Sequence, residues 1–437
     1  NFARIDSADI EISPLLCFIG DNNSGKSYVM NLLWGIIANG REILQNLYRD
    51  YNKTEKCMRC NEWIETNIGK TVTITDEIEQ LYIDWFNELL EQYKDVILRK
   101  TFNHEMKAGK IEIRNFSRTE KLSVHIWDAS KRFPEVEPSD NTIILEMHLD
   151  VATLENYSFI LCWVLLMRDL INVNRSLLGE EPPIYLPASR TGLLLVHKLI
   201  ASKATRNLFS IDPIENFQEK LTAPYVQFLD LLIKLQNTSA IKDDSKLKLI
   251  KFLQNEIIHG DITVKEDGKI IRYLPDDSND ELPMSITSSV VTEIASWLLL
   301  LTTRLPLRLI IIEEPEAHLH PALQKKIAQF LIRLVHNDFP VWITTHSDTI
   351  LQHFNNMIKL NNRPDADRQQ LLQDFNYTSE DLLSPDEINL YQFERGEIHT
   401  KITELQSGKY GFVVPSFNNS IDKLMTEIFA FQDQEDE

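Results

Sequence analysis

The stretch "FIGDNNSGKSYVMNLL", residues 18–33, decides the fold class of this 437-residue chain. It holds Gly20, Gly25, Lys26 and Ser27 in the spacing G-x-x-x-x-G-K-S, which is the pattern of a loop that binds nucleotide phosphates. The apolar run "LLCFIG" leads into the loop, and apolar residues recur after it at helical spacing. The order strand, glycine loop, helix is the context that this motif requires.

A phosphate site needs backbone amides that point inward around an anion at the start of a helix. We predict that the two glycines supply the backbone freedom, that the Lys26 ammonium reaches the β- and γ-phosphates and that the Ser27 hydroxyl ligates Mg²⁺. The predicted cofactors are therefore ATP and Mg²⁺. A chance match in an ordinary loop is the alternative. Nucleotide contacts are also predicted for the other loop residues and the residue after the motif: Asp21, Asn22, Asn23, Ser24 and Tyr28.

A second part of the site is predicted where the apolar run "LIII" ends in Glu313 and Glu314. Adjacent carboxylates at the end of a buried strand repel each other unless a cation lies between or beside them. We predict that Glu313 holds the water shell of Mg²⁺ and that Glu314 is the base that polarises the water attacking the γ-phosphate. The alternative interpretation is a strand end that simply reaches solvent.

His346 follows another apolar strand, "VWITTHSD". The carboxyl edge of a parallel sheet is the usual ligand edge of an α/β fold, so we predict that this imidazole senses the γ-phosphate. A lone histidine is more often a satisfied polar group, and that is the alternative. The predicted catalytic residues are thus Lys26, Glu314 and His346.

Hydrophobic spacing divides the rest of the chain into elements. The pattern predicts helices over residues 40–105, 153–173 and 191–257, and the helices of the last range form an inserted lobe. Two more helices are predicted, one over "SVVTEIASWLLLLTT" and one that begins at Pro321. Strands are predicted at "NFARIDSADIEI", "LLCFIG", "PPIYLPASR", "LRLIIIEEP" and "FPVWITTHSD". A separate antiparallel sheet is predicted from "KIEIRNF", "KLSVHIW" and "NTIILEMHLD", and a hairpin from "GDITVKEDGKIIRYLP" turning at Asp267 and Gly268.

These elements predict four segments. Residues 1–190 form the first part of an ATPase head with the phosphate loop, a helical insertion and the antiparallel strands. Residues 191–275 form the helical lobe and hairpin, and residues 276–362 complete the head, because strand, helix, strand at that spacing implies a parallel pair. Residues 363–437 are predicted to be an extension that contacts a partner or an oligomer.

Composition excludes several classes of protein. The net charge of −20, from 65 acidic and 45 basic residues, disfavours nucleic acid as the default partner and leaves direct DNA binding open. Four cysteines are too few for a disulfide framework and point to a reducing cytoplasm. The most apolar runs, "SFILCWVLLM" and "IASWLLLL", are about half as long as a membrane span requires, so no membrane association is expected.

The segments "GDNNSGKS", "LIIIEEPEAHLHP" and "ITTHSD" together resemble the ATP-binding-cassette branch of P-loop ATPases. In particular, they resemble the family of the overcoming-lysogenization-defect proteins and of ATPase subunits of bacterial anti-phage systems. "YLPASR" is similar to a further segment of that family. The resemblance runs from Phe18 to about Leu360, the middle matching only in layout. It implies an α/β cassette head with a mixed sheet, an antiparallel β subdomain and an inserted helical lobe.

The resemblance implies that two heads sandwich two nucleotides, so a homodimer or larger homo-oligomer is expected. Ser288 and Ser289 stand where the family has a serine-glycine-glycine signature that meets the γ-phosphate of the partner head. His318 lies in the loop that corresponds to the one touching the partner. Arg190 stands near the place of a glutamine that links Mg²⁺ to lobe movement, and it is expected to sense phosphate charge instead.

Simpler interpretations of these residues stay open. The alternative for the serines is an ordinary helix N-cap, and the alternative for the arginine is a surface position in a strand-to-helix turn. Two zinc sites are conceivable from the residue types. One uses Glu316, His318 and His320, and the other uses the C-x-x-C pair Cys57 and Cys60 with a second copy from another chain.

The resemblance implies an ATP-driven switch of the Septu or PARIS anti-phage type, arranged like a toxin–antitoxin pair. It would hold or activate a separate nuclease of the TOPRIM or HNH kind and respond to a phage-encoded protein. About 75 residues follow the head, which is too short for a nuclease domain of its own. The alternative is an SMC-like or DNA-repair head that acts on DNA directly, which predicts a coiled coil and a basic channel. A membrane transporter's ATPase subunit ranks last, because it predicts the glycine signature and the glutamine loop.

Overall fold

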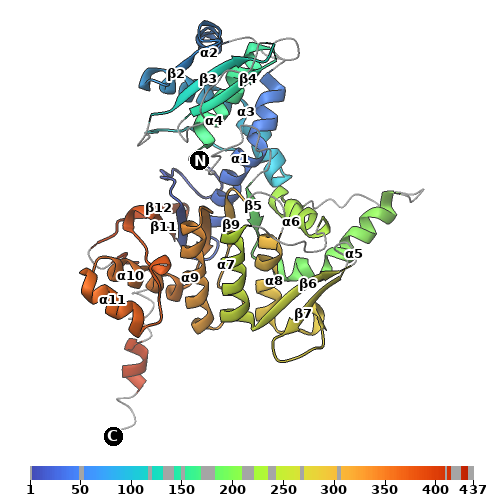
Figure 1. The fold of residues 1–437 in the computed structure, drawn as a ribbon, viewed down its shortest axis with the longest axis vertical. Coiled ribbons are helices and arrows are strands. Elements are labelled where there is room, and N and C mark those ends of the chain that lie inside the picture. Colours follow the sequence, from blue (N-terminus) through green and yellow to red (C-terminus); the bar gives the residue numbers. More distant parts are fainter. Residues whose placement is uncertain are drawn as a thin grey trace. The chain divides into compact units, whose positions relative to one another are not determined.

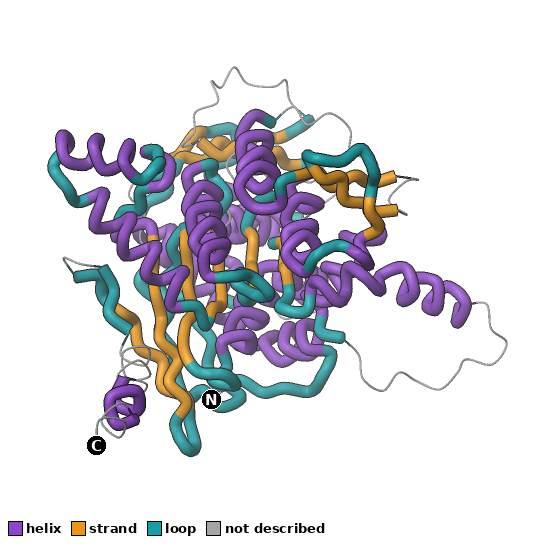
Figure 2. The backbone as a smooth tube through the Cα atoms, turned by 90° about the horizontal axis from the view of Figure 1, so that it is seen from below, coloured by secondary structure: helices purple, strands orange, loops and turns teal. Residues whose placement is uncertain are grey.

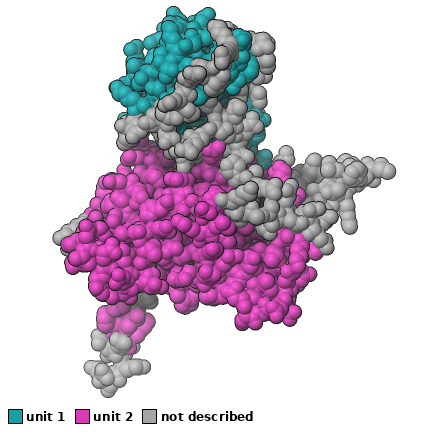
Figure 3. Space-filling model, viewed as in Figure 1, with its two compact units in different colours: residues 1–3, 31–183 teal, residues 4–30, 184–437 magenta. Residues whose placement is uncertain are grey.

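The computed structural model divides the chain into two compact units, coloured separately in Figure 3. The smaller unit comprises residues 1–3 and 31–183, and the larger comprises residues 4–30 and 184–437. The residues that the structure describes are 2–48, 54–116, 121–130, 142–148, 153–168, 183–208, 221–234, 243–265, 270–302, 307–408, 411–414 and 425–431.

The larger unit is built on a six-stranded sheet in the order β12-β11-β1-β10-β9-β5. Every neighbouring pair is parallel except β11 and β12, which are antiparallel, so the predicted mixed sheet is confirmed. Helices surround these strands in Figure 2. The strands are β1 (Leu15–Gly20), β5 (Ile184–Leu186), β9 (Ile310–Glu313), β10 (Val341–Thr345), β11 (Ile388–Arg395) and β12 (Thr400–Leu405), several of them labelled in Figure 1.

Local sequence explains where the helices of this unit begin. Pro321 is the first residue of α9, and the His320 imidazole caps that helix by accepting from the amide of Ala322. Ser347 caps α10 in the same way through the amide of Ile350. The helices are α5 (Arg190–Leu208), α6 (Ala223–Ile233), α7 (Asp244–Leu253), α8 (Ser289–Thr302), α9 (Pro321–His336), α10 (Asp348–Asn361) and α11 (Asp365–Asp374).

The predicted hairpin is confirmed, because β6 (Gly260–Lys265) pairs antiparallel with β7 (Ile270–Pro275) and a short third strand, β8 (Leu282–Pro283), joins them. Its predicted turn at Asp267 and Gly268 lies outside the described residues. The helical stretch predicted over residues 191–257 contains α5, α6, α7 and a π-helical turn, Gln254–Ile258. Residues 209–220 and 235–242 of that stretch also lie outside the described residues.

The smaller unit packs helices against a three-stranded sheet. Its helices are the later part of α1 (Lys26–Tyr48), then α2 (Glu55–Thr66), α3 (Asp76–Phe102) and α4 (Leu154–Met167); the end of the predicted helix 153–173 lies outside the described residues. Aromatic rings fill its interior: Trp85 of α3 lies edge-on to Phe159 of α4 with ring centroids 6.5 Å apart, and Phe159 stacks on Trp163 of the same helix at 6.2 Å. The strands are β2 (Thr71–Thr73), β3 (Ser123–Asp128) and β4 (Thr142–Met147).

The prediction of an antiparallel sheet in this region is wrong for one pairing. β2 and β3 are antiparallel, but β3 and β4 run parallel. The connection over residues 129–141 is long enough for the crossover that a parallel pair needs, whereas a tight turn would have forced a hairpin. The sheet of the smaller unit is therefore mixed.

Two predicted strands are not strands. In "KIEIRNF" the backbone of Ile113 is satisfied by the side chain of Asn87, which accepts from its amide and donates to its carbonyl oxygen, so no strand partner is needed. In "NFARIDSADIEI" the structure has only isolated bridges at Phe2 and Ile5. The amide of Glu11 donates to the Tyr391 hydroxyl instead of to a neighbouring strand.

A substitution at Gly20 tests how closely the phosphate loop packs against β11. Its φ is +130°, and a Cβ there would lie 2.1 Å from the carbonyl oxygen of Phe393. We expect Gly20→Ala to lower the free energy of unfolding by at least about 1–3 kcal/mol, the usual cost of strained backbone, measured by denaturant titration. The control is Gly192→Ala in α5, which meets no atom within 4 Å and should be neutral or stabilising. Equal stability of Gly20→Ala and wild type would contradict this account.

Candidate functional site

The carboxyl ends of five adjacent parallel strands meet at one edge of the large sheet. The strands are β5, β9, β10, β1 and β11 in that order. In the register, Glu313 lies beside Thr344, and Gly20 lies beside Phe393. This edge therefore collects the phosphate loop after β1, the twin acids at the end of β9, and His346 after β10. The three segments singled out in the sequence are thus neighbours in space.

The phosphate loop has the backbone that its glycines predict. Gly20 and Gly25 have φ of +130° and +98°, and Asn23 has φ +58°, a left-handed conformation that asparagine tolerates. The loop ends where α1 begins, at Lys26. Ser24 is buried under the loop, whereas the remaining predicted contact residues are exposed: Asp21, Asn22, Asn23, Ser27 and Tyr28.

The Lys26 side chain folds back over the loop. Its ammonium donates to the carbonyl oxygens of Gly20, at 3.0 Å, and Asp21, at 2.7 Å. Burial lowers the pKa of Lys26 to about 8, against the opposing influence of Glu314, Asp21 and Glu316. Phosphate oxygens carry negative charge and are therefore stronger acceptors for this ammonium than the two carbonyl oxygens that it contacts here.

Glu313 is buried and anchored at both carboxylate oxygens. Its Oε1 accepts from the Tyr185 hydroxyl at 2.9 Å, and its Oε2 accepts from the amide of Ala188 at 3.1 Å. Tyr185 is not among the residues predicted for the site, although its polar hydroxyl inside the apolar run "IYL" was a signal. Burial and the neighbouring Glu313 raise the pKa of Tyr185. The tyrosine therefore acts as a donor that fixes the direction of the carboxylate.

Glu314 adopts a left-handed backbone conformation, with φ +45°. Its amide donates to the carbonyl oxygen of Thr344 at 2.8 Å, which ties it to β10. The side chain is 44% exposed, and its Oε1 lies 3.8 Å from Nε2 of His346. The carboxylate is thus turned to the open side of the edge, where a water molecule can reach it.

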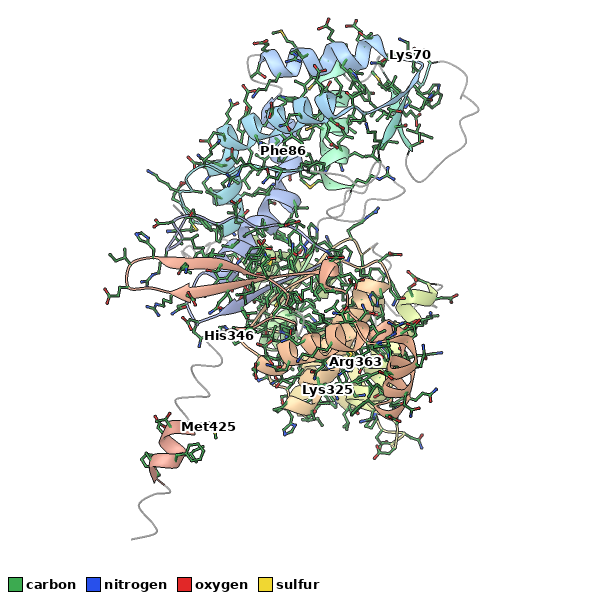
Figure 4. All side chains as sticks on the ribbon, turned by 90° about the vertical axis from the view of Figure 1, so that its left-hand side faces the viewer. Lys70, Phe86, Lys325, His346, Arg363 and Met425 are labelled. Atoms are coloured by element: carbon green, nitrogen blue, oxygen red, sulfur yellow. The ribbon has the colours of Figure 1, made fainter. Side chains whose placement is uncertain are left out.

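His346, labelled in Figure 4, lies close enough to Lys26 and Glu314 for both charges to act on its imidazole. Burial, and then the neighbouring Lys26, lower its pKa, while Glu314 opposes the shift. The imidazole is therefore neutral at pH 7 and available as a hydrogen-bond donor. Its backbone amide donates to Oε1 of Glu316 at 2.7 Å, so the inward-turned Glu316 fixes the start of the segment that follows β10.

Arg190 differs from its prediction. The side chain is fully buried, and its guanidinium donates to the carbonyl oxygens of Pro187, Glu313 and Glu314. It also forms an ion pair with Glu293. Because these partners occupy the guanidinium inside the protein, Arg190 neither lies at the surface nor directly senses phosphate in this conformation. Contact of Arg190 with nucleotide stays a prediction, which requires the guanidinium to leave these partners.

The signature-like serines are exposed at the start of α8. The Ser288 hydroxyl accepts from the amide of Val291 at 3.3 Å, which is the N-cap geometry foreseen as the simpler interpretation, and α8 begins at Ser289. His318 is exposed in the turn after β9, with φ +60°. Contact of these residues with nucleotide stays a prediction.

The zinc site conceivable from Glu316, His318 and His320 is not assembled among the described residues, whereas the one that needs a second copy of the chain stays a prediction. Glu316 faces the amide of His346, while His320 caps α9, so the acid and imidazole groups of that turn serve different partners. Cys57 and Cys60 are buried in the smaller unit, and burial raises the pKa of Cys60. Over the described ranges, the structure gathers no three His, Cys, Asp or Glu side chains that could hold a metal.

Within the same ranges, no helix is both long and apolar enough to cross a bilayer.

The pKa of Lys26 predicts a pH dependence. Its folded pKa of about 8 lies below the ordinary 10.5, so between these values the unfolded chain binds more protons than the folded one. The free energy of unfolding of wild type should therefore rise relative to Lys26→Met between about pH 7.5 and 9.5, as measured by denaturant titration. Parallel behaviour of the two proteins would show that Lys26 keeps an ordinary pKa.

Comparisons with known proteins agree with a nucleotide hydrolase. Residues 196–351 match the model of a family described as AAA ATPase domain, a match that contains the twin acids and His346 but covers less than half of the chain. Among curated protein sequences no match is found. The large sheet and the phosphate loop give the chain a mixed α/β fold consistent with a P-loop nucleotide hydrolase.

Solved structures similar to the chain include heads of SMC proteins. One is an Smc head domain with an extended coiled coil, bound to the C-terminal domain of ScpA, from Pyrococcus furiosus: identity is 10%, the TM-score is 0.25, and the match covers 42% of this chain and 37% of that one. Another, an SmcHead bound to the C-winged helix domain of ScpA, has 10% identity and a TM-score of 0.35 over 91% and 92% of the two chains. These scores are too low to carry an argument, so the fold rests on the strand order and the phosphate loop.

Proposed function

We propose that this chain binds and hydrolyses ATP with Mg²⁺ and works as a switch subunit that controls a separate effector. The observation that carries the proposal is the meeting of Lys26, the twin acids and His346 at one sheet edge. His346 Nε2 lies 3.8 Å from the Glu314 carboxylate, and the charges of Lys26 and Glu314 each act on that imidazole. A phosphate loop beside a carboxylate and an imidazole is an arrangement that can position a phosphoanhydride and the water that attacks it.

The residues present fit a nucleotide with its metal. Gly20 and Gly25 supply the positive-φ backbone that the loop turns require, and the exposed Ser27 hydroxyl at the start of α1 is available as a ligand. Each oxygen of the Glu313 carboxylate accepts one hydrogen bond from the protein, so each keeps capacity to accept from a water molecule around Mg²⁺. When bound, the nucleotide supplies the labile phosphoanhydride and Mg²⁺ offsets its negative charge.

Each side chain has a role that follows from its surroundings. Lys26 exchanges the carbonyl oxygens of Gly20 and Asp21 for phosphate oxygens, and this exchange favours its charged form. The exposed carboxylate of Glu314 accepts a proton from the attacking water. His346 is neutral and donates a hydrogen bond toward the phosphate, with its backbone held by Glu316.

The switch and its setting rest on the sequence resemblance. The start of α8, with Ser288 and Ser289 exposed, is free to meet the nucleotide of a second copy, so ATP favours a homodimer of heads. In this proposal the heads belong to a bacterial anti-phage system and hold or release a nuclease of the TOPRIM or HNH kind. The excess of acidic residues supports a protein partner over direct contact with DNA.

Lys26→Ala tests nucleotide binding. The change removes the ammonium over the loop, and we expect the affinity for a fluorescent ATP analogue to fall at least about a hundredfold, the size of two or more charge-assisted hydrogen bonds. The matched control is Lys246→Ala, another buried lysine of the same unit, on α7, which should bind the analogue as wild type does. Wild-type affinity in Lys26→Ala would refute the phosphate-loop assignment.

Glu314→Gln tests the base. The amide keeps the size of the side chain but cannot accept a proton, so we expect hydrolysis to fall by about 10²- to 10⁴-fold while the analogue still binds. Dimers should accumulate with ATP, which light scattering coupled to size-exclusion chromatography measures. Glu256→Gln, which changes an exposed acid paired with Lys326, is the control for loss of charge. Hydrolysis at the wild-type rate in Glu314→Gln would move the base to another residue.

A further inference from the structure

A buried network surrounds Arg190 and joins three elements of the larger unit. One guanidinium nitrogen donates to the carbonyl oxygens of Pro187, at 3.0 Å, and Glu313, at 2.5 Å. The other donates to the carbonyl oxygen of Glu314 at 2.8 Å and pairs with the carboxylate of Glu293. Arg190 therefore links the turn after β5 and the end of β9 to α8, which carries Glu293.

Both members of the ion pair are removed from solvent, since their side chains are 0% exposed. Burying a charge is costly unless it is paired and hydrogen-bonded, and here the pairing and the carbonyl contacts offset that cost, although Nε of Arg190 has no hydrogen-bond partner among the described residues. The second carboxylate oxygen of Glu293 accepts from the Thr191 hydroxyl at 2.6 Å, and the Trp297 ring lies 5.9 Å from the guanidinium carbon. The ion pair therefore connects the start of α5 to α8 in the interior of the larger unit.

The carbonyl contact with Glu314 fixes a strained residue. A left-handed conformation is unfavourable for glutamate, so it persists only when its surroundings hold it. Here the amide of Glu314 is bound by Thr344 and its carbonyl oxygen by Arg190. The backbone of Glu314 is thus hydrogen-bonded at its amide and at its carbonyl oxygen. These two hydrogen bonds together set the direction in which the carboxylate points.

We propose that Arg190 is a positioning residue that makes the geometry of the base Glu314 depend on the placement of α8. Glu293 lies about one turn after the exposed serines at the start of α8, so a displacement of that helix pulls on the guanidinium. The same guanidinium holds the carbonyl oxygens of both twin acids. A partner that engages the start of α8 therefore adjusts the catalytic edge without touching it. This role rests on the proposed ATPase function.

The test compares Arg190→Met with Arg333→Met. Arg333 forms a similar ion pair with the buried Asp381, at 2.6 and 3.0 Å, but it joins α9 to the turn Ser379–Asp381 and lies outside the catalytic edge. We expect Arg190→Met to lower kcat about a hundredfold, the effect of a misplacement of about 1 Å, with KM and ATP-analogue affinity changed less than about threefold. Arg333→Met should lose stability with kcat unchanged.

Glu293→Gln is the second variant and guards against loss of folding in Arg190→Met. It keeps the volume and an acceptor for Thr191 but removes the charge that holds the guanidinium. We expect kcat to fall about tenfold at constant KM, and the double variant to lose less than the product of the single effects, because the two residues act as one unit.

The outcomes separate the two proposals. Wild type that neither binds nor hydrolyses ATP would refute the ATPase function, and this role with it. Wild type that hydrolyses ATP while Arg190→Met and Glu293→Gln keep its kcat would refute the positioning role alone. Loss of kcat in Arg333→Met equal to that in Arg190→Met would also overturn it, because the effect would then reflect general destabilisation. Should Arg190→Met not fold, the kcat of Glu293→Gln decides.

Discussion

The site depends on the electrostatic balance between one buried ammonium and the acids around it. Lys26 is taken out of water at the start of α1, and burial alone would favour its neutral form. Glu314, Asp21 and Glu316 oppose that tendency, as do the loop carbonyls that accept from the ammonium. The charged form of Lys26 is thus less stable than it is in water. A phosphate group, with its negative charge, is the ligand that stabilises this charged form most strongly.

The same edge shows how distant segments shape the loop. The carbonyl oxygen of Phe393 on β11 accepts from the amide of Asp21 at 3.2 Å, and the Asp21 carboxylate accepts from the amide of Arg395 at 3.1 Å. The region after residue 362 therefore places β11 directly against the phosphate loop. On the other side of the site, Arg190 holds the backbone of the twin acids. The phosphate loop after β1 is therefore supported by β11, which lies more than 350 residues later in the sequence, whereas the twin acids are supported by Arg190 from the middle of the sequence.

Motifs that combine a glycine pattern with apolar strands were predictable from the sequence. The phosphate loop, the strands ending in Glu313 and before His346, and the hairpin of β6 and β7 follow from local pattern alone. The loop at Ile113 and the burial of Arg190 were not predictable, because each depends on a partner far away in sequence. The parallel pairing of β3 and β4 was missed because local pattern does not give strand direction and antiparallel pairs are the commoner kind. An arginine in a turn is ordinarily predicted to be exposed, and only its pairing with a buried glutamate on another helix explains why Arg190 is buried.

Calorimetric titration of the wild-type chain with ATP and Mg²⁺ near pH 8, in two buffers of different ionisation enthalpy, tests the central claim most directly. Phosphate beside Lys26 raises its pKa above the value of about 8 in the free protein, so binding should saturate at one nucleotide per chain and take up about half a proton. Absence of binding heat in both buffers would contradict the claim. Saturable binding without proton uptake would place the phosphate away from Lys26 and contradict it as well.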